Sequence, residues 1–483
     1  MADRVSNVSS CPILIRKVDP RAGRRSDGVI MVQFSGKSVL VLGLARSGVA
    51  VAKLLQRLGA QVTVNDASAR DRVDADAKAL EARGIRVITD GHPQELADAC
   101  DLVVKNPGIP YDRPIVLRAL ERGVPVITEV EVAFQVTAAP IIGITGSNGK
   151  TTTTTLVGHM LHEAGVPATV AGNIGTPLSA VALDTPADHV LVAEFSSFQL
   201  QGTVSLRPKI AALLNIYPAH LDYHGTLEKY INAKKRLFAN QEPTDIAILN
   251  GDQEIVADLA SELAAKVWLV STKRRVSRGA YLLDGKLMLA VPGAQNATPV
   301  MDVSEIALRG EHNVQNALFA AAIAFAAGAS AHAIADTLRE FSGVEHRMEF
   351  VRQIAGVSFV NDSKATNPQA TIKTISSFVE PIIAILGGLE RGDDLSALVP
   401  VAANQLKAVL AIGESGPRMI EMARQAGVPV ALQVSSLPEA VRQAAALAES
   451  GDVVLLSPAA ASWDMFASFE DRGRIFKEAV HML

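Results

Sequence analysis

A glycine-rich loop follows an apolar, strand-like segment, residues 140–145, in the first half of the chain. The loop reads Gly146-Ser147-Asn148-Gly149-Lys150-Thr151-Thr152. Its backbone N–H groups can bind phosphate oxygens, Lys150 can neutralise the β and γ phosphates, and the Thr151 hydroxyl can ligate Mg²⁺. The strict P-loop pattern requires a glycine at the position of Ile144, but in this chain the first glycine of the loop is Gly146. We therefore predict a phosphate-binding loop that is tighter than the usual one.

Polar side chains follow two further strand-like segments of the same region. Glu194 ends the segment 190–193, and His220 and Asp222 come after the segment 210–215. The carboxyl ends of parallel strands meet at one edge of a sheet, where ligands collect. A carboxylate there suits Mg²⁺. A surface glutamate and a structural histidine are the alternatives, but the neighbouring loop favours a site.

Lys234 lies in the helix-like segment 230–238, beside Lys235 and Arg236. Three adjacent cations are typical of a solvent-exposed basic helix face. The local pattern alone therefore gives Lys234 no role.

A second glycine-rich turn, Gly43-Leu44-Ala45-Arg46-Ser47-Gly48, follows the strand-like segment 38–42. A helix N-terminus in this setting can bind a pyrophosphate, and Asp66 is spaced to bind a ribose hydroxyl. Ala45 replaces the glycine that allows the closest approach of a pyrophosphate, and such turns also serve packing alone. The turn indicates a nucleotide ligand, but it indicates NAD in particular less strongly. A third turn, Leu386-Gly387-Gly388, is weak evidence by itself.

These residues need a scaffold of short strands and helices. At both ends of the chain, β-branched segments alternate with helix-like segments, which is typical of parallel α/β sheets. The segments expected to form strands there are residues 38–42, 61–64, 85–89 and 101–104, and residues 357–360, 382–386, 408–412, 428–432 and 453–456. We predict an α/β protein of three domains: a Rossmann-like N-terminal domain, a central P-loop-type ATPase domain and a Rossmann-like C-terminal domain.

Composition excludes several classes of protein. Of 483 residues, 46 are Lys or Arg and 50 are Asp or Glu, so the net charge of −4 gives no broad basic surface for nucleic acid. Two cysteines provide neither a disulfide framework nor a cysteine zinc site and favour a reducing, cytoplasmic compartment. The longest apolar helix-like run, residues 317–328, is shorter than the roughly 18 residues that suggest a membrane span. We expect no nucleic-acid partner and no membrane span.

Residues 1–30 differ from the rest of the chain. They show no apolar periodicity, and their short apolar stretch, residues 11–15, is too short for a secretory signal. A targeting arm is one interpretation, but a disordered tail is favoured, because Met31 precedes the first strand-like segment and could be the natural start.

Several motifs in one order resemble the Mur ligases of peptidoglycan synthesis. They are the loop 146–152, Gly172-Asn173-Ile174-Gly175, residues 194–200, His220 to Asp222 with Ala233-Lys234, and residues 310–316. The later motifs, residues 345–349, 361–367 and 456–464, resemble the branch that adds D-glutamate to UDP-N-acetylmuramoyl-L-alanine. The resemblance runs from about residue 35 to the end of the chain.

The resemblance implies an ATP-dependent, ADP-forming ligase that acts through an acyl phosphate. It implies a UDP-substrate domain at residues 31–135, an ATP-binding domain at 136–342 and an amino-acid-binding domain at 343–483. The implied cofactors are ATP and Mg²⁺ at two sites, with Lys234 carbamoylated. The implied partners are the small-molecule substrates, and we expect a cytoplasmic monomer.

The resemblance also implies roles for individual residues. Catalytic roles fall on Lys150, His220 and Lys234. The residues implied to bind ATP are Gly146, Ser147, Asn148, Gly149, Lys150, Thr151, Thr152, Asn316, Arg347 and Asp362. Those implied to bind metal are Thr151, Glu194, His220 and Lys234. Those implied to bind the UDP substrate are Leu44, Asp66, Asn106, Gly108, Asn173, Ser196 and Gln199. Those implied to bind D-glutamate are Lys364, Thr366, Arg391, Ser462 and Phe469.

Two residues depart from the resemblance. Arg391 stands where some relatives have lysine, and Trp463 stands where leucine is found, so contacts to glutamate could differ. An NAD-dependent oxidoreductase is the second hypothesis, and a P-loop switch or binding module is the third.

Overall fold

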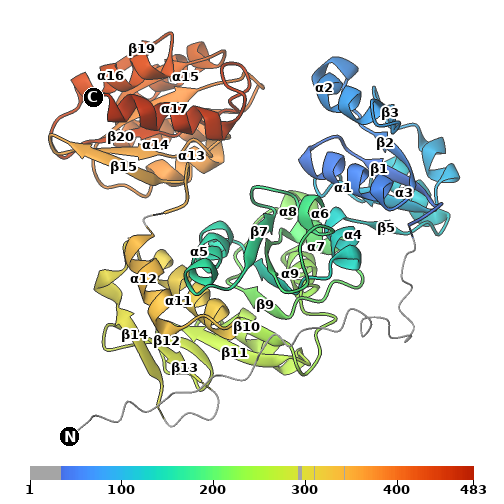
Figure 1. Cartoon of the computed structure of the whole chain (residues 1–483). Coiled ribbons are helices and arrows are strands. Elements are labelled where there is room, and N and C mark those ends of the chain that lie inside the picture. Colours follow the sequence, from blue (N-terminus) through green and yellow to red (C-terminus); the bar gives the residue numbers. More distant parts are fainter. Residues whose placement is uncertain (1–33, 292–295, 309, 342) are drawn as a thin grey trace, which may run out of the picture. The chain divides into compact units, whose positions relative to one another are not determined.

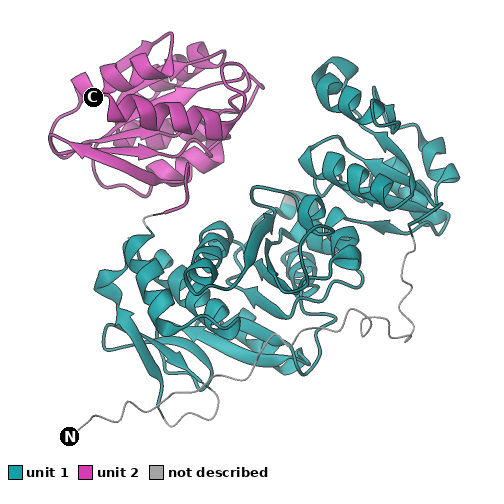
Figure 2. Cartoon of the chain, in the orientation of Figure 1, with its two compact units in different colours: residues 1–341 teal, residues 342–483 magenta. Residues whose placement is uncertain are grey.

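The computed structural model describes residues 34–291, 296–308, 310–341 and 343–483. The chain forms two compact units, residues 1–341 and 342–483 (Figure 2), which are described separately. The first unit holds two β-sheets and the second holds one (Figure 1). The predicted disordered tail, residues 1–30, lies outside the described residues. In the described part of the chain, no helix is both long enough and apolar enough to cross a membrane.

The N-terminal sheet has five parallel strands in the order β3-β2-β1-β4-β5. The strands are β1 (Ser38–Leu42), β2 (Gln61–Asn65), β3 (Arg86–Ile88), β4 (Leu102–Lys105) and β5 (Val126–Ile127). The helices are α1 (Arg46–Arg57), α2 (Arg70–Glu81), α3 (Pro114–Glu121) and α4 (Glu129–Val136). Helix α1 buries Val51, Leu54 and Leu55, a spacing that places one apolar face against the sheet.

The central sheet has nine strands in the order β14-β13-β12-β11-β10-β9-β6-β8-β7. Its strands are β6 (Ile141–Thr145), β7 (Ala168–Gly172), β8 (Val190–Glu194), β9 (Ile210–Leu213), β10 (Ile246–Asn250), β11 (Lys266–Ser271), β12 (Gly279–Leu283), β13 (Lys286–Ala290) and β14 (Thr298–Asp302). Its helices are α5 (Lys150–Glu163), α6 (Leu178–Val181), α7 (Ser197–Gln201), α8 (Leu221–His224), α9 (Leu227–Lys235), α10 (Glu254–Ala257), α11 (Glu311–Ala326) and α12 (Ala331–Glu340). Helix α11 is apolar and largely buried, so it belongs to the core.

The second unit has a six-stranded sheet in the order β15-β16-β20-β17-β18-β19. Its strands are β15 (Glu349–Ile354), β16 (Val357–Asn361), β17 (Ile382–Gly387), β18 (Leu406–Ile412), β19 (Val430–Gln433) and β20 (Val453–Leu456). Its helices are α13 (Pro368–Ile375), α14 (Val399–Gln405), α15 (Gly416–Gln425), α16 (Leu437–Leu447) and α17 (Phe469–His481). Strand β15 is antiparallel and forms one edge.

The predicted α/β class and the three-sheet organisation are confirmed. The sheets span residues 38–127, 141–302 and 349–456, so the predicted domain boundaries at 135/136 and 342/343 fall between them and stay predictions. The sequence did not predict the antiparallel strands β13 and β14 or the edge strand β15. These strands are partly exposed and give a weaker signal than the buried apolar runs of the central strands.

Candidate active site

The predicted phosphate loop joins β6 to α5, as the sequence indicates. Its backbone is fixed by Asn215, whose carbonyl accepts from Ser147 N at 3.0 Å and whose side-chain oxygen accepts from Asn148 N at 2.9 Å. The ammonium of Lys150 donates to the carbonyls of Gly146 and Ser147, at 2.9 and 3.0 Å. The cation and the start of α5 thus lie at one loop, where both favour an anion.

Gly149 ends this loop in the left-handed conformation, with φ of 81°. A Cβ there would lie 2.1 Å from Oδ1 of Asn316, a residue of α11 that is nearly buried. Both the backbone angle and the close approach therefore require glycine. The structure brings Asn316 to the loop, as predicted for an ATP-binding residue.

Glu194 lies at the end of β8, next to β6 in the sheet, and is 2% exposed. Its carboxylate accepts from the Thr151 hydroxyl at 2.8 Å and from Nδ2 of Asn173 at 2.8 Å. Asn173 reaches this position because Gly172 has φ of 108° and packs against the Glu194 backbone. Three of the predicted site residues therefore meet beside the loop.

This donor set fits magnesium that also takes ligands from a phosphate substrate. Mg²⁺ is usually held by one or two carboxylates, substrate oxygens and water. Thr151 and Glu194 supply a hydroxyl and a carboxylate next to the phosphate loop. Among the described residues, no group of three or more His, Cys, Asp or Glu side chains is placed so that it could hold a metal ion.

The prediction of a solvent-exposed Lys234 from its local pattern is wrong, because the side chain is 1% exposed. Helix α9 begins at Leu227, and its inner face carries Tyr230 and Lys234 one turn apart. The amine donates to Gly146 O at 2.8 Å and lies 4.7 Å from the centre of the Tyr230 ring. Burial, reinforced by the positive charge of Lys150 and opposed by Glu194, holds the pKa of Lys234 well below its usual value.

His220 precedes α8 in a left-handed conformation, with φ of 55°, and is exposed. Its ring packs edge-on against Phe198, with 4.9 Å between centroids. A metal-binding or catalytic role for His220 stays a prediction.

The N-terminal glycine-rich turn contacts Asp66 and Asn106, two other residues predicted to bind the UDP substrate. Asp66 accepts from Leu44 N at 2.7 Å and from Ser68 N at 2.8 Å, and the Ser47 hydroxyl donates to Oδ1 of Asn106 at 3.2 Å. Burial acts to raise the pKa of Asp66, but the backbone N–H donors lower it on balance, so the group is ionised at neutral pH. Leu44, Asp66 and Asn106 therefore gather where β1, β2 and β4 end.

Ser196 and Gln199 form the capping box of α7. Gln199 N donates to the Ser196 hydroxyl at 3.2 Å, and Ser196 N donates to Oε1 of Gln199 at 2.9 Å. These bonds satisfy backbone donors at the start of the helix. Their predicted contact with the UDP substrate stays a prediction.

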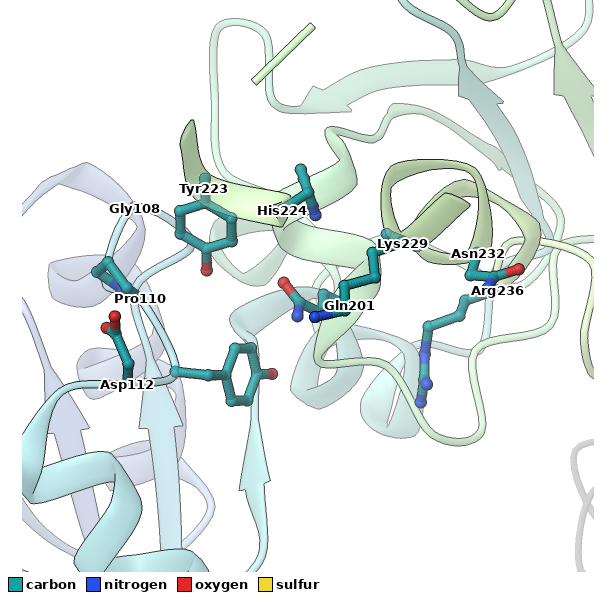
Figure 3. Close-up of a pocket in the computed structure, with 11 residues that line it drawn as sticks. Gly108, Pro110, Asp112, Gln201, Tyr223, His224, Lys229, Asn232 and Arg236 are labelled. Atoms are coloured by element: carbon teal, nitrogen blue, oxygen red, sulfur yellow. The ribbon is translucent and has the colours of Figure 1, made fainter. Parts of the chain in front are cut away.

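A cavity of about 650 Å³ lies between the loop that follows β4 and helices α7 to α9 (Figure 3). Gly108, another residue predicted to bind the UDP substrate, lines it together with Tyr111 and Tyr223. Lys229, Asn232 and Arg236 form its opposite wall (Figure 3). Gly108 thus borders open space on the side that faces the central sheet.

In the second unit, the predicted residues other than Arg347, which precedes β15, follow the ends of three adjacent parallel strands: β16, β20 and β17. Asp362 is 4% exposed and accepts from the Thr374 hydroxyl at 2.5 Å and from the Ser457 hydroxyl at 3.0 Å. Burial raises the pKa of Asp362 on balance, although these donors and the positive charge of the exposed Arg347 act to lower it. The predicted contacts of Asp362 and Arg347 with ATP stay predictions.

The residues predicted to bind D-glutamate form two groups in this unit. Nζ of Lys364 lies 5.9 Å from the centre of the Phe469 ring, and the guanidinium of Arg391 lies 4.7 Å from the centre of the Trp463 ring. Ser462 is buried next to Trp463, and Thr366 follows two residues after Lys364.

Arg472, which the sequence analysis did not select, links the segments that carry these groups. It is fully buried and donates to Ser363 O at 2.9 Å and to Ala460 O at 3.1 Å. Burial lowers the pKa of Arg472 to about 10, so it stays a cation at neutral pH. Asn215 was also missed. The available signal for Asn215 was its position two residues after β9, whereas the position of Arg472 within α17 gave no signal.

The chain matches domain models of a single family along most of its length. They are the Mur ligase MurD-like N-terminal domain at residues 37–128, the Mur ligase middle domain at 144–324 and the Mur ligase glutamate ligase domain at 346–460. The chain therefore belongs to the Mur ligase family.

Curated relatives of high identity include D-glutamate ligases. The UDP-N-acetylmuramoylalanine–D-glutamate ligase of Geobacillus sp. (strain WCH70) is 48% identical over 452 residues, which cover 93% of this chain and 98% of that protein. The protein of the same name from Bacillus cereus (strain G9842) is 46% identical, and the match covers 94% of this chain and 99% of that protein.

Solved structures show the same fold at lower identity. The UDP-N-acetylmuramate-alanine ligase MurC of Thermotoga maritima is 20% identical, with a TM-score of 0.52, and the match covers 92% of this chain and 99% of that one. The MurF ligase of Thermotoga maritima, solved in complex with ADP, is 17% identical, with a TM-score of 0.50, and the match covers 93% of this chain and 96% of that one.

Proposed function

We propose that this chain joins D-glutamate to UDP-N-acetylmuramoyl-L-alanine with cleavage of ATP, in the cytoplasmic stage of peptidoglycan synthesis. The observation that carries the proposal is the phosphate loop with Thr151 bonded to Glu194 and the buried amine of Lys234 beside it. Relatives of this name align over nearly the whole chain, which supports the choice of substrates.

The reaction requires an activated carboxylate. Transfer of the γ-phosphoryl group of ATP to a carboxylate oxygen of the alanyl residue gives an acyl phosphate and ADP. The amine of D-glutamate then attacks the carbonyl carbon, the carbon–oxygen bond to phosphate breaks, and the amine loses a proton as the amide forms. Inorganic phosphate is released.

In this scheme, the loop 146–152 holds the phosphates of ATP and Lys150 neutralises charge on the group that is transferred. Asn316 fixes the loop at Gly149, and Arg347 and Asp362 add contacts to ATP. Magnesium, when bound, supplies positive charge to the phosphate oxygens. Thr151, Glu194, His220 and Lys234 would hold it, at two sites.

Lys234 has the properties that a carbamate requires. Burial lowers its pKa and so favours the neutral amine, the form that captures CO₂ and loses a proton to give the carbamate. The resulting anion would sit beside the loop where an ammonium would repel a metal ion. The lysine therefore becomes an oxygen ligand instead of a competing charge.

The substrates are assigned to different sheets. The UDP group would bind at Leu44, Asp66, Asn106 and Gly108, with Asn173, Ser196 and Gln199 at the muramoyl-alanine end. D-Glutamate would bind at Lys364, Thr366, Arg391, Ser462 and Phe469, where two cations suit two carboxylates. We propose that the enzyme acts as a monomer.

One assay tests this function. Phosphate release is measured with ATP, Mg²⁺ and UDP-N-acetylmuramoyl-L-alanine, in the presence of each candidate amino acid in turn. The ligase releases phosphate only when D-glutamate and the UDP substrate are both present. Turnover of ATP without them would indicate a P-loop switch, and an NADH-linked absorbance change without ATP would indicate an oxidoreductase.

A further inference from the structure

Lys105, the last residue of β4, is among the largest fully buried side chains in the described part of the chain, with 0% exposure. Burying an ammonium is costly unless its donors are satisfied. Its Nζ lies 2.9 Å from Ile109 O, 3.4 Å from Pro107 O and 3.5 Å from Asn106 O. The side chain therefore turns back and binds the carbonyls of the turn that directly follows its own strand.

The central domain supplies a second group at the same carbonyls. The hydroxyl of Tyr223, in α8, lies 3.1 Å from Ile109 O and 3.3 Å from Pro107 O, and donates its single proton to one of them. It also accepts from Nζ of Lys105 at 3.3 Å. We call this pair the Lys105–Tyr223 clamp. It ties residues 106–109 to a helix of the neighbouring sheet.

The clamp connects two regions assigned to substrates. On one side, Asn106 accepts from Ser47 in the N-terminal glycine-rich turn. On the other side, aromatic contacts run from Tyr223 to His224 and from His224 to Tyr230, with 5.1 and 5.4 Å between ring centroids. The Tyr230 hydroxyl lies 2.9 Å from the hydroxyl of Ser147 in the phosphate loop. Hydrogen bonds and ring contacts therefore join the two turns.

Packing does not fix the turn on every side. Gly108, Pro110 and Asp112 border the cavity of about 650 Å³, with Tyr223 at its rim (Figure 3). The hydrogen bonds of the clamp therefore reach the backbone of a turn that borders this cavity.

We propose that Lys105 and Tyr223 are positioning residues, which hold the turn of residues 106–109 at a set position relative to the phosphate loop. The proposal rests on the proposed function in one respect, because it takes the turn to bind the diphosphate of a UDP substrate. Transfer between two bound substrates depends on their alignment, so displacement of the turn would weaken UDP-substrate binding and slow the transfer.

The test compares Lys105→Met, Tyr223→Phe and the double variant with the parent enzyme. Lys105→Met keeps a long apolar stem but removes the donors, and Tyr223→Phe removes only the hydroxyl. Lys78→Met, at a lysine whose side chain is 71% exposed and pairs with Asp74 on the same domain, is the control. We expect Lys105→Met to raise KM for the UDP substrate by about 10-fold or more and KM for ATP by less than about 2-fold.

Coupling between the two residues is part of the prediction. Since both act on the same carbonyls, the double variant should raise KM by clearly less than the product of the two single effects. Tyr223→Phe keeps the ring contacts, so it tests the clamp even if Lys105→Met does not fold. Equal increases in KM for both substrates, or fully multiplicative effects, would overturn the positioning role.

Hydrogen exchange tests the clamp without relying on the reaction. In Lys105→Met, amides of residues 106–112 and of α8 should exchange faster than in the parent, whereas α16 of the second unit should not change. If the variant shows this faster exchange but the parent lacks D-glutamate-dependent turnover, the clamp is retained and the proposed function is rejected. Unchanged exchange in both variants would reject the clamp, whatever the reaction.

Discussion

At the scale of single residues, the surroundings of a buried cation decide which role it is suited to. Lys234 and Lys105 are both fully buried, yet their surroundings differ. Lys234 lies beside the loop, Lys150 and Glu194, where its charge state alters the field on a phosphate. Lys105 is surrounded by neutral backbone and hydroxyl oxygens, which lets it hold a turn. We therefore propose different roles for the two buried lysines.

Lys234→Ala tests the carbamate. An ammonium near Mg²⁺ would be repelled, since unit charges about 4 Å apart interact by about 4 kcal/mol at an effective dielectric of 20. If the carbamate replaces that cation, the variant should lose about 100-fold or more of kcat with little change in its melting transition. A small added carboxylate that fits the vacated space should restore part of the rate.

Lys235→Ala is the matched control, because this neighbour pairs with Glu262 on the outer side of the helix. It should leave kcat within about 2-fold of the parent value. Near-normal turnover in a folded Lys234→Ala protein would contradict the carbamate.

Arg391→Ala tests where D-glutamate binds. The guanidinium rests 4.7 Å from the centre of the Trp463 ring, and an arginine fixed in this way can bind a carboxylate with less loss of freedom. KM for D-glutamate should rise by about 10- to 100-fold and KM for ATP by less than about 2-fold, as measured by phosphate release. Equal changes in both constants would assign Arg391 to a structural role.

At the scale of elements, the link between the first two sheets contains a buried acid. Glu129 begins α4, is 2% exposed and accepts from Ser179 N of α6 at 3.1 Å. Among the described residues, its Oε1 and the Ser179 hydroxyl lack hydrogen-bond partners. Burial, only partly offset by Ser179 and Gln199, raises the pKa of Glu129 to about 7.

The raised pKa predicts a specific pH dependence. The folded chain keeps this proton to about pH 7, whereas an unfolded chain loses it near pH 4.5. The associated stability is therefore present below pH 4.5 and is lost as the pH rises through 7. Glu129→Gln should stabilise the protein by about 1–3 kcal/mol at pH 8 and by much less at pH 5.

Melting transitions of parent and variant at the two pH values provide the measurement. The side-chain amide that Glu129→Gln introduces can donate to the Ser179 hydroxyl, so the substitution leaves no additional group unpaired. A stability difference that is the same at pH 5 and pH 8 would contradict the raised pKa.

The strands that carry the predicted site were predictable because they are short and buried, and because β1 and β6 lead into glycine-rich turns. The alternation of such strands with helices was enough to place Glu194 and the loop 146–152 at one sheet edge. Exposed strands such as β14 lack that apolar signal. The burial of Lys234 was not predictable from its neighbours, because it depends on α9 beginning at Leu227 and turning this lysine inward.

At the scale of the whole molecule, the same arrangement occurs in each sheet: side chains of the predicted site follow the carboxyl ends of adjacent parallel strands. In the first unit these are β1, β2 and β4, and then β6, β8 and β9. In the second unit they are β16, β20 and β17. We therefore expect one structural arrangement to serve the UDP substrate, ATP and the amino acid, with only the residues that follow the strands differing.

The last prediction concerns residues 1–30, which precede this scaffold. The first strand begins at Ser38, and the residues predicted to bind substrates begin at Leu44. The segment itself has no apolar periodicity that would form a core with the N-terminal sheet. A chain that starts at Met31 should therefore keep kcat and both KM values within about 2-fold and melt at the same temperature as the full chain. A shortened protein that folds but has lost ligase activity would show that these residues take part in function.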